Sequence, residues 1–488
     1  MNKLTKHISL ALVVVISFAG CNDFGDMNKD PNNVSTARTE LLLTNAQKSV
    51  SDLITLTYPV MFVQYMSTTQ YDQNETYSNT GANFNGYYTS PLKDLTEIIE
   101  LNQADPATYL EFGSTENQIA VARILKAYMY HNMVDIWGPL PYSEALLGAD
   151  NYQPAYDDAT SIYSALINEL KEASTQINVS SAPVKGDIIF EGDMSQWIKF
   201  ANTIRARLAL RLADVSPSIA KSEFENAASN LITNDVMYKY LAETANQNPW
   251  YAAYITRNDF AISDVMDDFM TPKGDLRLTA YANPAADVDN GDGVTQMDEV
   301  IGMPYSILDA GSITAAAVSY PGKAIGAGGP NVGIQDAPLP IVTMSEVHFM
   351  LAEASARGWS VSGDAPTHYE LAIKASWEQW DVFDENAFST YMTHQDVIYD
   401  AANYKKSIGE QKWVALYPLG QEAWSEWRRL GYPVLTPHEF ANNPSGEIPV
   451  RMRYPSSELT LNASSYQNAL SKLGGPDDDQ TPIFWDVD

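Results

Sequence analysis

Two clusters of aromatic and polar side chains have the composition of a surface that binds polar, CH-rich molecules. The first cluster lies at residues 248–259. Its candidate ligand-binding members are Trp250, Tyr251, Tyr254, Arg257 and Asn258. Aromatic faces stack on the CH groups of a sugar ring, while guanidinium and amide groups bind hydroxyls. The alternative is that Trp250 and Tyr254 pack beneath a neighbouring helix, with Asp259 as its cap.

The second cluster runs from Gln70 to Tyr88. Its candidate ligand-binding members are Tyr71, Asn74, Tyr77 and Phe84. The length and polarity of this segment predict a surface loop, and loops of this kind often carry binding residues. The alternatives are that this loop contacts a partner protein or that it only covers the protein surface without binding anything.

An acidic stretch at residues 287–299 resembles a calcium-binding loop. Placing Asp292 and Gly293 at the fifth and sixth positions puts Asn290 at the third and Glu299 at the twelfth. Val288 then falls at the first position, where it offers no ligand atom, so an adjacent acid would have to replace it. The candidate ligands are Asp287, Asp289, Asn290, Asp292 and Glu299. We expect either a Ca²⁺ site or an unliganded acidic turn, and no other cofactor.

The motifs of common catalytic sites are missing from the sequence. It contains no Gly-x-Ser-x-Gly, no His-Glu-x-x-His and no glycine-rich phosphate loop. We therefore expect a protein that is not an enzyme and predict no catalytic residue. A glycoside hydrolase remains the alternative, because the separation of its two carboxylates is a property of the fold.

The net charge limits the range of partners. The chain carries 61 acidic against 30 basic residues, a formal charge of −31. Such a surface repels phosphate backbones and anionic lipid heads, so we expect the protein not to bind nucleic acid.

The amino-terminal region predicts export and lipid anchoring. A short apolar run, Ile8 to Ala19, follows a basic start and precedes Cys21, the only cysteine. Phe18-Ala19-Gly20-Cys21 has the layout of a bacterial lipobox, so residues 1–20 are predicted to be a signal peptide. Residues 21–36 would then be a lipidated flexible tether, attaching the protein to the membrane through the anchor only. The alternative is a chance cysteine beside a cleaved secretory signal.

Beyond the tether the sequence predicts a mainly α fold with a loop-rich portion. Apolar residues recur at helical spacing in these segments: 41–56, 92–101, 118–136, 159–177, 194–213, 261–269, 343–358, 369–381 and 405–430. Stacked helix pairs imply a superhelix of the tetratricopeptide type, although no strict period of about 34 residues is present. We predict a single body at 37–488 with these parts: helix-pair scaffold at about 37–245 and 341–430, loop-rich portion at about 246–340, irregular carboxy-terminal part at 431–488.

Four local sequences, taken in order, carry a resemblance to a known family. They are VDIWGPLPY at 134–142, WIKFANT at 197–203, LAEA at 351–354 and IPVR at 448–451. Together with the lipobox they resemble the SusD/RagB nutrient-binding outer-membrane lipoproteins, most closely the SusD-like 2 branch. The resemblance implies a helical body of tetratricopeptide-like pairs that docks on a TonB-dependent (SusC-like) transporter. It also implies capture of oligosaccharides, or of peptides in some members, at the cell surface.

The charged residues within these motifs have a structural interpretation. Arg205, Arg207 and Arg211 share one predicted helix, and in so acidic a protein we expect them to pair with carboxylates inside the stack. Trp137 is expected to fill a seam between helix pairs, and Glu353 to pack within another helix.

Overall fold

The computed structural model describes residues 37–78, 81–327 and 333–487. The chain divides into two compact units, Met1–Arg38 and Thr39–Asp488, and every element named below belongs to the second. Cys21 and the predicted tether lie outside the described residues. Among the residues that are described, no helix has both the length and the apolar character needed to cross a bilayer.

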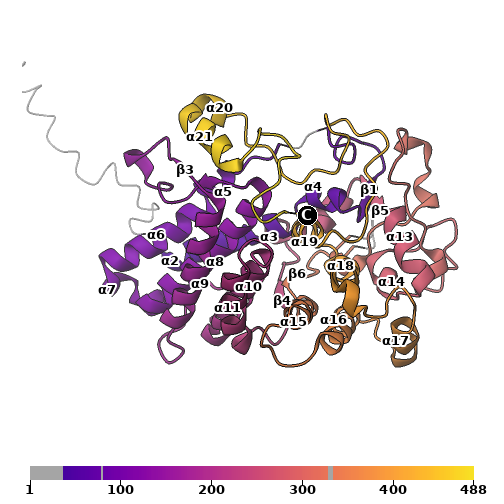
Figure 1. The fold of residues 1–488 in the computed structure, drawn as a ribbon, viewed down its shortest axis with the longest axis horizontal. Coiled ribbons are helices and arrows are strands. Elements are labelled where there is room, and N and C mark those ends of the chain that lie inside the picture. Colours follow the sequence, from indigo (N-terminus) through magenta and orange to yellow (C-terminus); the bar gives the residue numbers. More distant parts are fainter. Residues whose placement is uncertain (1–36, 79–80, 328–332, 488) are drawn as a thin grey trace, which may run out of the picture. The chain divides into compact units, whose positions relative to one another are not determined.

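The amino-terminal half is an array of helices. They are α2 (Thr39–Lys48), α3 (Val50–Ile54), α4 (Thr57–Phe62), α5 (Asn85–Thr89), α6 (Pro91–Ala104), α7 (Pro106–Tyr109), α8 (Thr115–Trp137), α9 (Ala159–Gln176), α10 (Met194–Arg211) and α11 (Pro217–Ala227). Neighbours pack in succession, α2 on α6, α6 on α8, α8 on α9, α9 on α10 and α10 on α11. Figure 1 shows α8, α9, α10 and α11 side by side.

A second group of helices continues the array. They are α15 (Met344–Ala356), α16 (Ala365–Gln379), α17 (Glu385–Met392), α18 (Tyr404–Ala415) and α19 (Gly420–Leu430). Helix α15 packs on α10, α16 and α18, and α19 packs on α18 and α4. The predicted mainly α fold of stacked helix pairs is confirmed.

Short elements make up the remainder. The helices are α12 (Pro249–Tyr254), α13 (Asp264–Met270), α14 (Arg277–Tyr281), α20 (Glu458–Leu461) and α21 (Ala463–Leu473). The 3-10 turns are Leu110–Phe112, Gly148–Asp150, Ala228–Asn230, Thr244–Asn246, Thr271–Lys273, Met297–Glu299, Ala310–Ser312, Ala315–Ala317, Lys323–Ile325 and Ala401–Asn403. The strands are β1 (Met66–Thr68), β2 (Leu140–Pro141), β3 (Tyr156–Asp157), β4 (Val236–Tyr238), β5 (Phe260–Ile262) and β6 (Leu339–Val342).

The strands form three antiparallel pairs, β1 with β5, β2 with β3 and β4 with β6. In the first pair Met66 lies opposite Ile262 and Thr68 opposite Phe260. Since the two aromatic clusters predicted from the sequence flank these strands, β1–β5 pairing brings both clusters to one place.

Local capping explains where the long helices begin and end. The Ser114 side chain accepts a hydrogen bond from the Asn117 backbone at the start of α8, and Gly138, with φ of 82°, ends it. Helix α9 is capped by Asp158. The preceding residue, Asp157, belongs to β3.

Three predicted helices are divided or shortened. The segment 405–430 forms two helices, α18 and α19, because Pro418 lacks a backbone N–H and its ring does not fit a helix interior. The segment 41–56 forms α2 and α3. The segment 261–269 begins as strand β5, and only α13 follows as helix.

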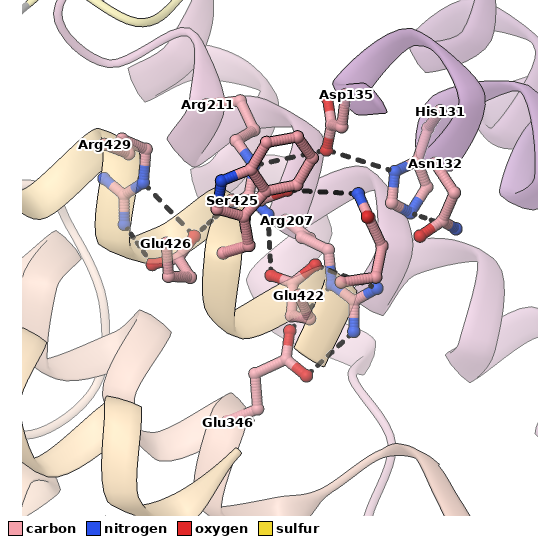
Figure 2. A network of polar contacts seen from close by, with 12 residues as sticks. His131, Asn132, Asp135, Arg207, Arg211, Glu346, Glu422, Ser425, Glu426 and Arg429 are labelled. Carbon is pink, nitrogen blue, oxygen red and sulfur yellow. Dashed lines mark hydrogen bonds and ion pairs between the residues drawn. The ribbon is translucent and has the colours of Figure 1, made fainter. Parts of the chain in front are cut away.

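The interior between the helix pairs holds a network of buried ion pairs (Figure 2). Arg207 on α10 donates two bonds to Glu346 on α15, at 2.7 and 2.8 Å. One turn later, Arg211 binds Glu422 of α19 at 2.7 Å and also Glu426. All five side chains are buried. Pairing of these arginines with carboxylates inside the stack, expected from the sequence, is therefore confirmed.

The same network reaches α18 and the far end of α15. Arg429 donates to both carboxylate oxygens of Glu353, each at 2.6 Å, and to Glu426 at 2.7 Å. Lys412 on α18 binds Glu426 at 2.9 Å. Glu353 is thus packed inside the array, as predicted, and four helices share one set of charges.

Asp135 on α8 accepts hydrogen bonds from residues that are distant in the sequence. It accepts hydrogen bonds from the Tyr163 hydroxyl and, at 3.0 Å, from the Trp485 indole. Burial by itself raises the pKa of Asp135, but the interaction with His131, whose Nδ1 lies 3.7 Å away, and the charge of Arg211 outweigh it and lower the pKa to about 2. The carboxyl is therefore ionised at neutral pH.

Removing one charge from this network should be strongly destabilising. Burial raises the pKa of Glu422, yet the charges of Arg207 and Arg211 lower it to about 2, so the carboxylate is ionised. We expect Glu422→Gln to lower the free energy of unfolding in urea by about 3–5 kcal/mol, because two buried guanidinium groups each lose one of their charged partners.

The control is Lys239→Ala, which removes an ion pair to Glu191 on the exposed surface. Solvent screens this pair, so no measurable loss is expected. Equal effects of the two substitutions would show that the buried network does not stabilise the array.

Candidate ligand-binding groove

Two loops that follow β1 and precede β5 are joined by hydrogen bonds. The backbone N–H of Thr69 donates to the Asp259 carbonyl at 2.9 Å, and the Thr69 hydroxyl donates to the Asn258 carbonyl. The Arg257 guanidinium lies 5.0 Å from the centre of the Tyr71 ring and pairs with Asp259 at 2.9 Å. One member of each predicted cluster therefore meets the other at the surface.

Two adjoining cavities open beside these loops. One has a volume of about 930 Å³ and is lined in part by Gln70, Arg257 and Ile313. The other has a volume of about 540 Å³ and is lined in part by Val294 and Lys323. Both are lined by Asn258, Ala315, Val318 and Tyr320. We call the two cavities together the loop groove.

The groove combines apolar walls with separate polar groups. Ile255 and Val318 supply aliphatic surface, Tyr320 supplies a half-buried ring, and Lys323 is an exposed cation. Asn258 stands where the cavities meet, and its side-chain oxygen is buried with no hydrogen-bond partner among the described residues. A buried amide oxygen without a donor is unusual, and a ligand hydroxyl would supply one.

Four of the predicted rings lie in the core instead of the groove: Tyr77, Phe84, Trp250 and Tyr254. None is more than 3% exposed. The Tyr254 hydroxyl donates to the Phe260 carbonyl at 2.6 Å, and Phe84 packs edge-on against Trp137, with ring centres 5.5 Å apart. Rings this enclosed offer almost no face to a sugar, so the expected ligand contact is corrected to a packing role for these four, although Phe84 also forms part of the wall of a separate cavity described below.

The other predicted residues divide between the groove and its surroundings. Arg257 and Asn258 line the groove, and Tyr71 lies against Arg257 with 54% of its surface exposed. Tyr251 and Asn74 are half-buried and are not among the described lining residues.

Sequence reasoning missed much of the groove wall. Met303, Ile313, Thr314, Tyr320 and Lys323 all come from the irregular segment between α14 and β6. Their only sequence signal is membership of the loop-rich portion, which has no periodicity from which a facing direction could be read.

The acidic loop borders the groove through Asp289. Both carboxylate oxygens of Glu299 accept backbone N–H groups, from Asn290 at 3.0 Å and from Gln296 at 2.9 Å. Asp292 likewise accepts from the Val294 backbone at 2.7 Å. Among described residues no three His, Cys, Asp or Glu side chains converge as a metal site would require. In this conformation the carboxylates brace the loop, and Ca²⁺ binding stays a prediction.

A buried carboxyl holds the Tyr71 loop. One oxygen of Glu75 accepts from the backbone N–H and the hydroxyl of Thr68, at 2.7 and 2.6 Å. The other lies 3.8 Å from Nε2 of His438. Burial raises the pKa of Glu75 to about 8, although the bonds from Thr68 act in the opposite direction. Glu75 therefore remains mostly protonated at neutral pH.

Comparison with known proteins identifies the family. The family model described as "Starch-binding associating with outer membrane" matches residues 31–455. The chain belongs to this SusD-like family. No curated protein sequence matches it.

Solved structures agree with the SusD-like assignment. A chitin-binding protein is 28% identical, with a TM-score of 0.76, and the match covers 92% of this chain and 100% of that chain. A chitin-binding SusD homolog from Flavobacterium johnsoniae is 25% identical, with a TM-score of 0.74, covering 92% and 97%. A putative outer membrane protein from Bacteroides vulgatus, 24% identical, shares the fold with a TM-score of 0.79, covering 92% and 100%.

Buried and exposed aromatic side chains in this SusD-like protein should respond differently to truncation. We expect Trp250→Ala to lower the free energy of unfolding by about 3–5 kcal/mol, because it empties a buried site. Tyr71→Ala, at an exposed ring, should leave the thermal midpoint nearly unchanged. A stable Trp250→Ala protein would contradict the core position of this ring.

The raised pKa of Glu75 predicts that the folded protein loses stability as the pH rises toward 8. Its ordinary pKa is 4.5 and its folded pKa is raised to about 8, so the folded state holds the proton more tightly. This contribution is fully present below about pH 4.5 and is lost as the pH rises through about 8. We expect Glu75→Gln, which stays neutral, to flatten the fall of the thermal midpoint over this range.

Glu370→Gln, at an exposed position on α16, serves as the matched control and should keep the wild-type slope. If Glu75→Gln also keeps that slope, then Glu75 is ionised in the folded protein and the assignment is wrong.

Proposed function

We propose that this SusD-like protein binds oligosaccharide in the loop groove and delivers it, uncleaved, to a TonB-dependent outer-membrane transporter. The observation that carries the proposal is the groove itself, where an unpartnered amide oxygen of Asn258 and the Arg257 guanidinium stand beside aliphatic walls and the Tyr320 ring. This mixture suits a ligand with CH-rich faces and many hydroxyls.

The relatives support the choice of ligand class. Two solved structures that match nearly the whole chain are described as chitin-binding, at 28% and 25% identity. We therefore take chitin oligosaccharides as the first probes. Attachment to the outer membrane through lipid on Cys21 completes the proposal, since a tethered receptor stays next to its transporter.

Binding without cleavage is favoured by the lining of the groove. Glycoside hydrolysis uses two carboxyl groups that flank the bond. Of the described residues that line the loop groove, one is acidic, Asp289. A glycoside hydrolase is the second candidate, and peptide capture the third.

Removing the polar groups of the groove should weaken oligosaccharide binding. We expect Asn258→Ala and Arg257→Ala each to raise the Kd for a chitin oligosaccharide about tenfold, since each substitution loses a hydrogen bond in a partly desolvated site. Isothermal titration calorimetry measures the effect, with Lys239→Ala as the control.

The same samples separate the three candidates. Binding with no new reducing ends supports the proposal, and new reducing ends would identify a hydrolase. Binding of peptides alone would favour the third candidate. Unchanged affinity in both groove variants would place the ligand elsewhere.

A further inference from the structure

A separate cavity lies on elements that do not form the loop groove. Its volume is about 520 Å³, and its walls come from the start of α5 and α6, the connection between β2 and β3, and α20. It shares no lining residue with the loop groove. Its wall α20 begins at Glu458, beyond the residues that the family model matches.

The rim of this cavity exposes an unusual amount of apolar surface. Tyr152 is 80% exposed and Leu461 is 65% exposed, and both line the cavity. Leu147, at 51%, precedes the lining residue Gly148. Contiguous exposed apolar surface beside a cavity generally marks a binding site.

The segment that carries Tyr152 is held in place by hydrogen bonds. The Glu144 carboxylate accepts from the Ala155 backbone at 3.0 Å and from the Asn151 amide at 3.2 Å. The Gln153 amide donates to the Leu461 carbonyl at 2.9 Å. The residues on both sides of Tyr152 are therefore held by hydrogen bonds, and an exposed ring on a braced segment costs little additional entropy when a ligand stacks on it.

A further bond ties the segment to the junction of α20 and α21, where the Asn462 amide donates to the Pro154 carbonyl at 2.9 Å. The β2–β3 connection and the α20–α21 region thus form one wall, joined across about 300 residues of sequence.

Polar groups complete the lining. Asn85, Thr89 and Lys93 line the cavity from α5 and α6. The Lys93 ammonium gives one bond to Glu97 at 3.2 Å, which leaves two of its three N–H groups for another acceptor. The Thr89 hydroxyl donates to its own helix and can still accept.

We propose that this cavity is a second carbohydrate subsite, in which the exposed ring of Tyr152 stacks on a sugar and the α5–α6 side chains bind its hydroxyls. The choice of ligand class rests on the proposed function, whereas the site itself rests on the ring, the bracing bonds and the lining. A long polysaccharide could occupy both sites, and linked contacts raise apparent affinity without a new interaction at either one.

The experiment compares a short chitin oligosaccharide with long polymers. Wild type, Tyr152→Ala, Tyr152→Phe and Asn258→Ala are titrated with the oligosaccharide by calorimetry. They are then run in affinity gels that contain soluble chitin derivatives, starch or other neutral polysaccharides. Unchanged thermal midpoints establish that the variants are folded, as expected for an exposed ring.

For Tyr152→Ala we expect half the oligosaccharide stoichiometry of wild type and about a hundredfold weaker retention by the preferred polymer. Tyr152→Phe should behave as wild type, because it keeps the stacking face. Asn258→Ala should keep the full stoichiometry, with one of the two sites about tenfold weaker.

Results other than these would distinguish the second subsite from the loop groove. Wild-type stoichiometry and retention in Tyr152→Ala would overturn the second subsite and leave the groove intact. Loss of all binding in Tyr152→Ala, with none lost in Asn258→Ala, would keep the subsite and overturn the groove. No binding to any carbohydrate, or binding of an apolar peptide at Tyr152 in its place, would overturn the inference.

Discussion

Charges buried between helix pairs are the constraint on which this structure depends. Arg207 and Arg211 on α10 bind carboxylates on α15 and α19, which follow more than a hundred residues later, and Arg429 on α19 binds Glu353 back on α15. A buried charge without its partner costs several kcal/mol, so any other register of these helices would leave guanidinium groups unpaired. The network therefore selects one stacking of the array from the many that apolar side chains alone would permit.

The groove takes its position from this array. Just before β1, the Tyr65 hydroxyl donates to the Trp413 carbonyl on α18, and the Trp413 indole donates back to the Val63 carbonyl at 2.9 Å. The strand that carries the Tyr71 loop is thus fixed to a helix of the network. Pairing of β1 with β5 then places Arg257 beside that loop. A rigid scaffold with binding residues on its loops is a common solution, because loops tolerate variation in ligand contacts that helices do not.

The sequence predicted the helices well because their apolar spacing is a local signal. It also predicted that Arg207 and Arg211 pair with carboxylates, because an acidic chain offers many carboxylates to each of its few cations. It failed where the answer depends on distant residues. Nothing local to Trp250 indicates that it is enclosed by other segments, and the division at Pro418 was missed inside an apolar run. The groove wall near Tyr320 has no periodicity, so its orientation could not be predicted.

The position of Trp485 has a consequence for how the protein is made. Its indole donates to Asp135, and the guanidinium of Arg428 lies between the rings of Trp424 and Trp485, 3.8 and 4.8 Å from their centres. Ribosomes build the chain from its amino end. The hydrogen bond from the Trp485 indole to Asp135 can therefore form only after residue 485 has been added. A nascent chain cannot complete this part of the interior before that point.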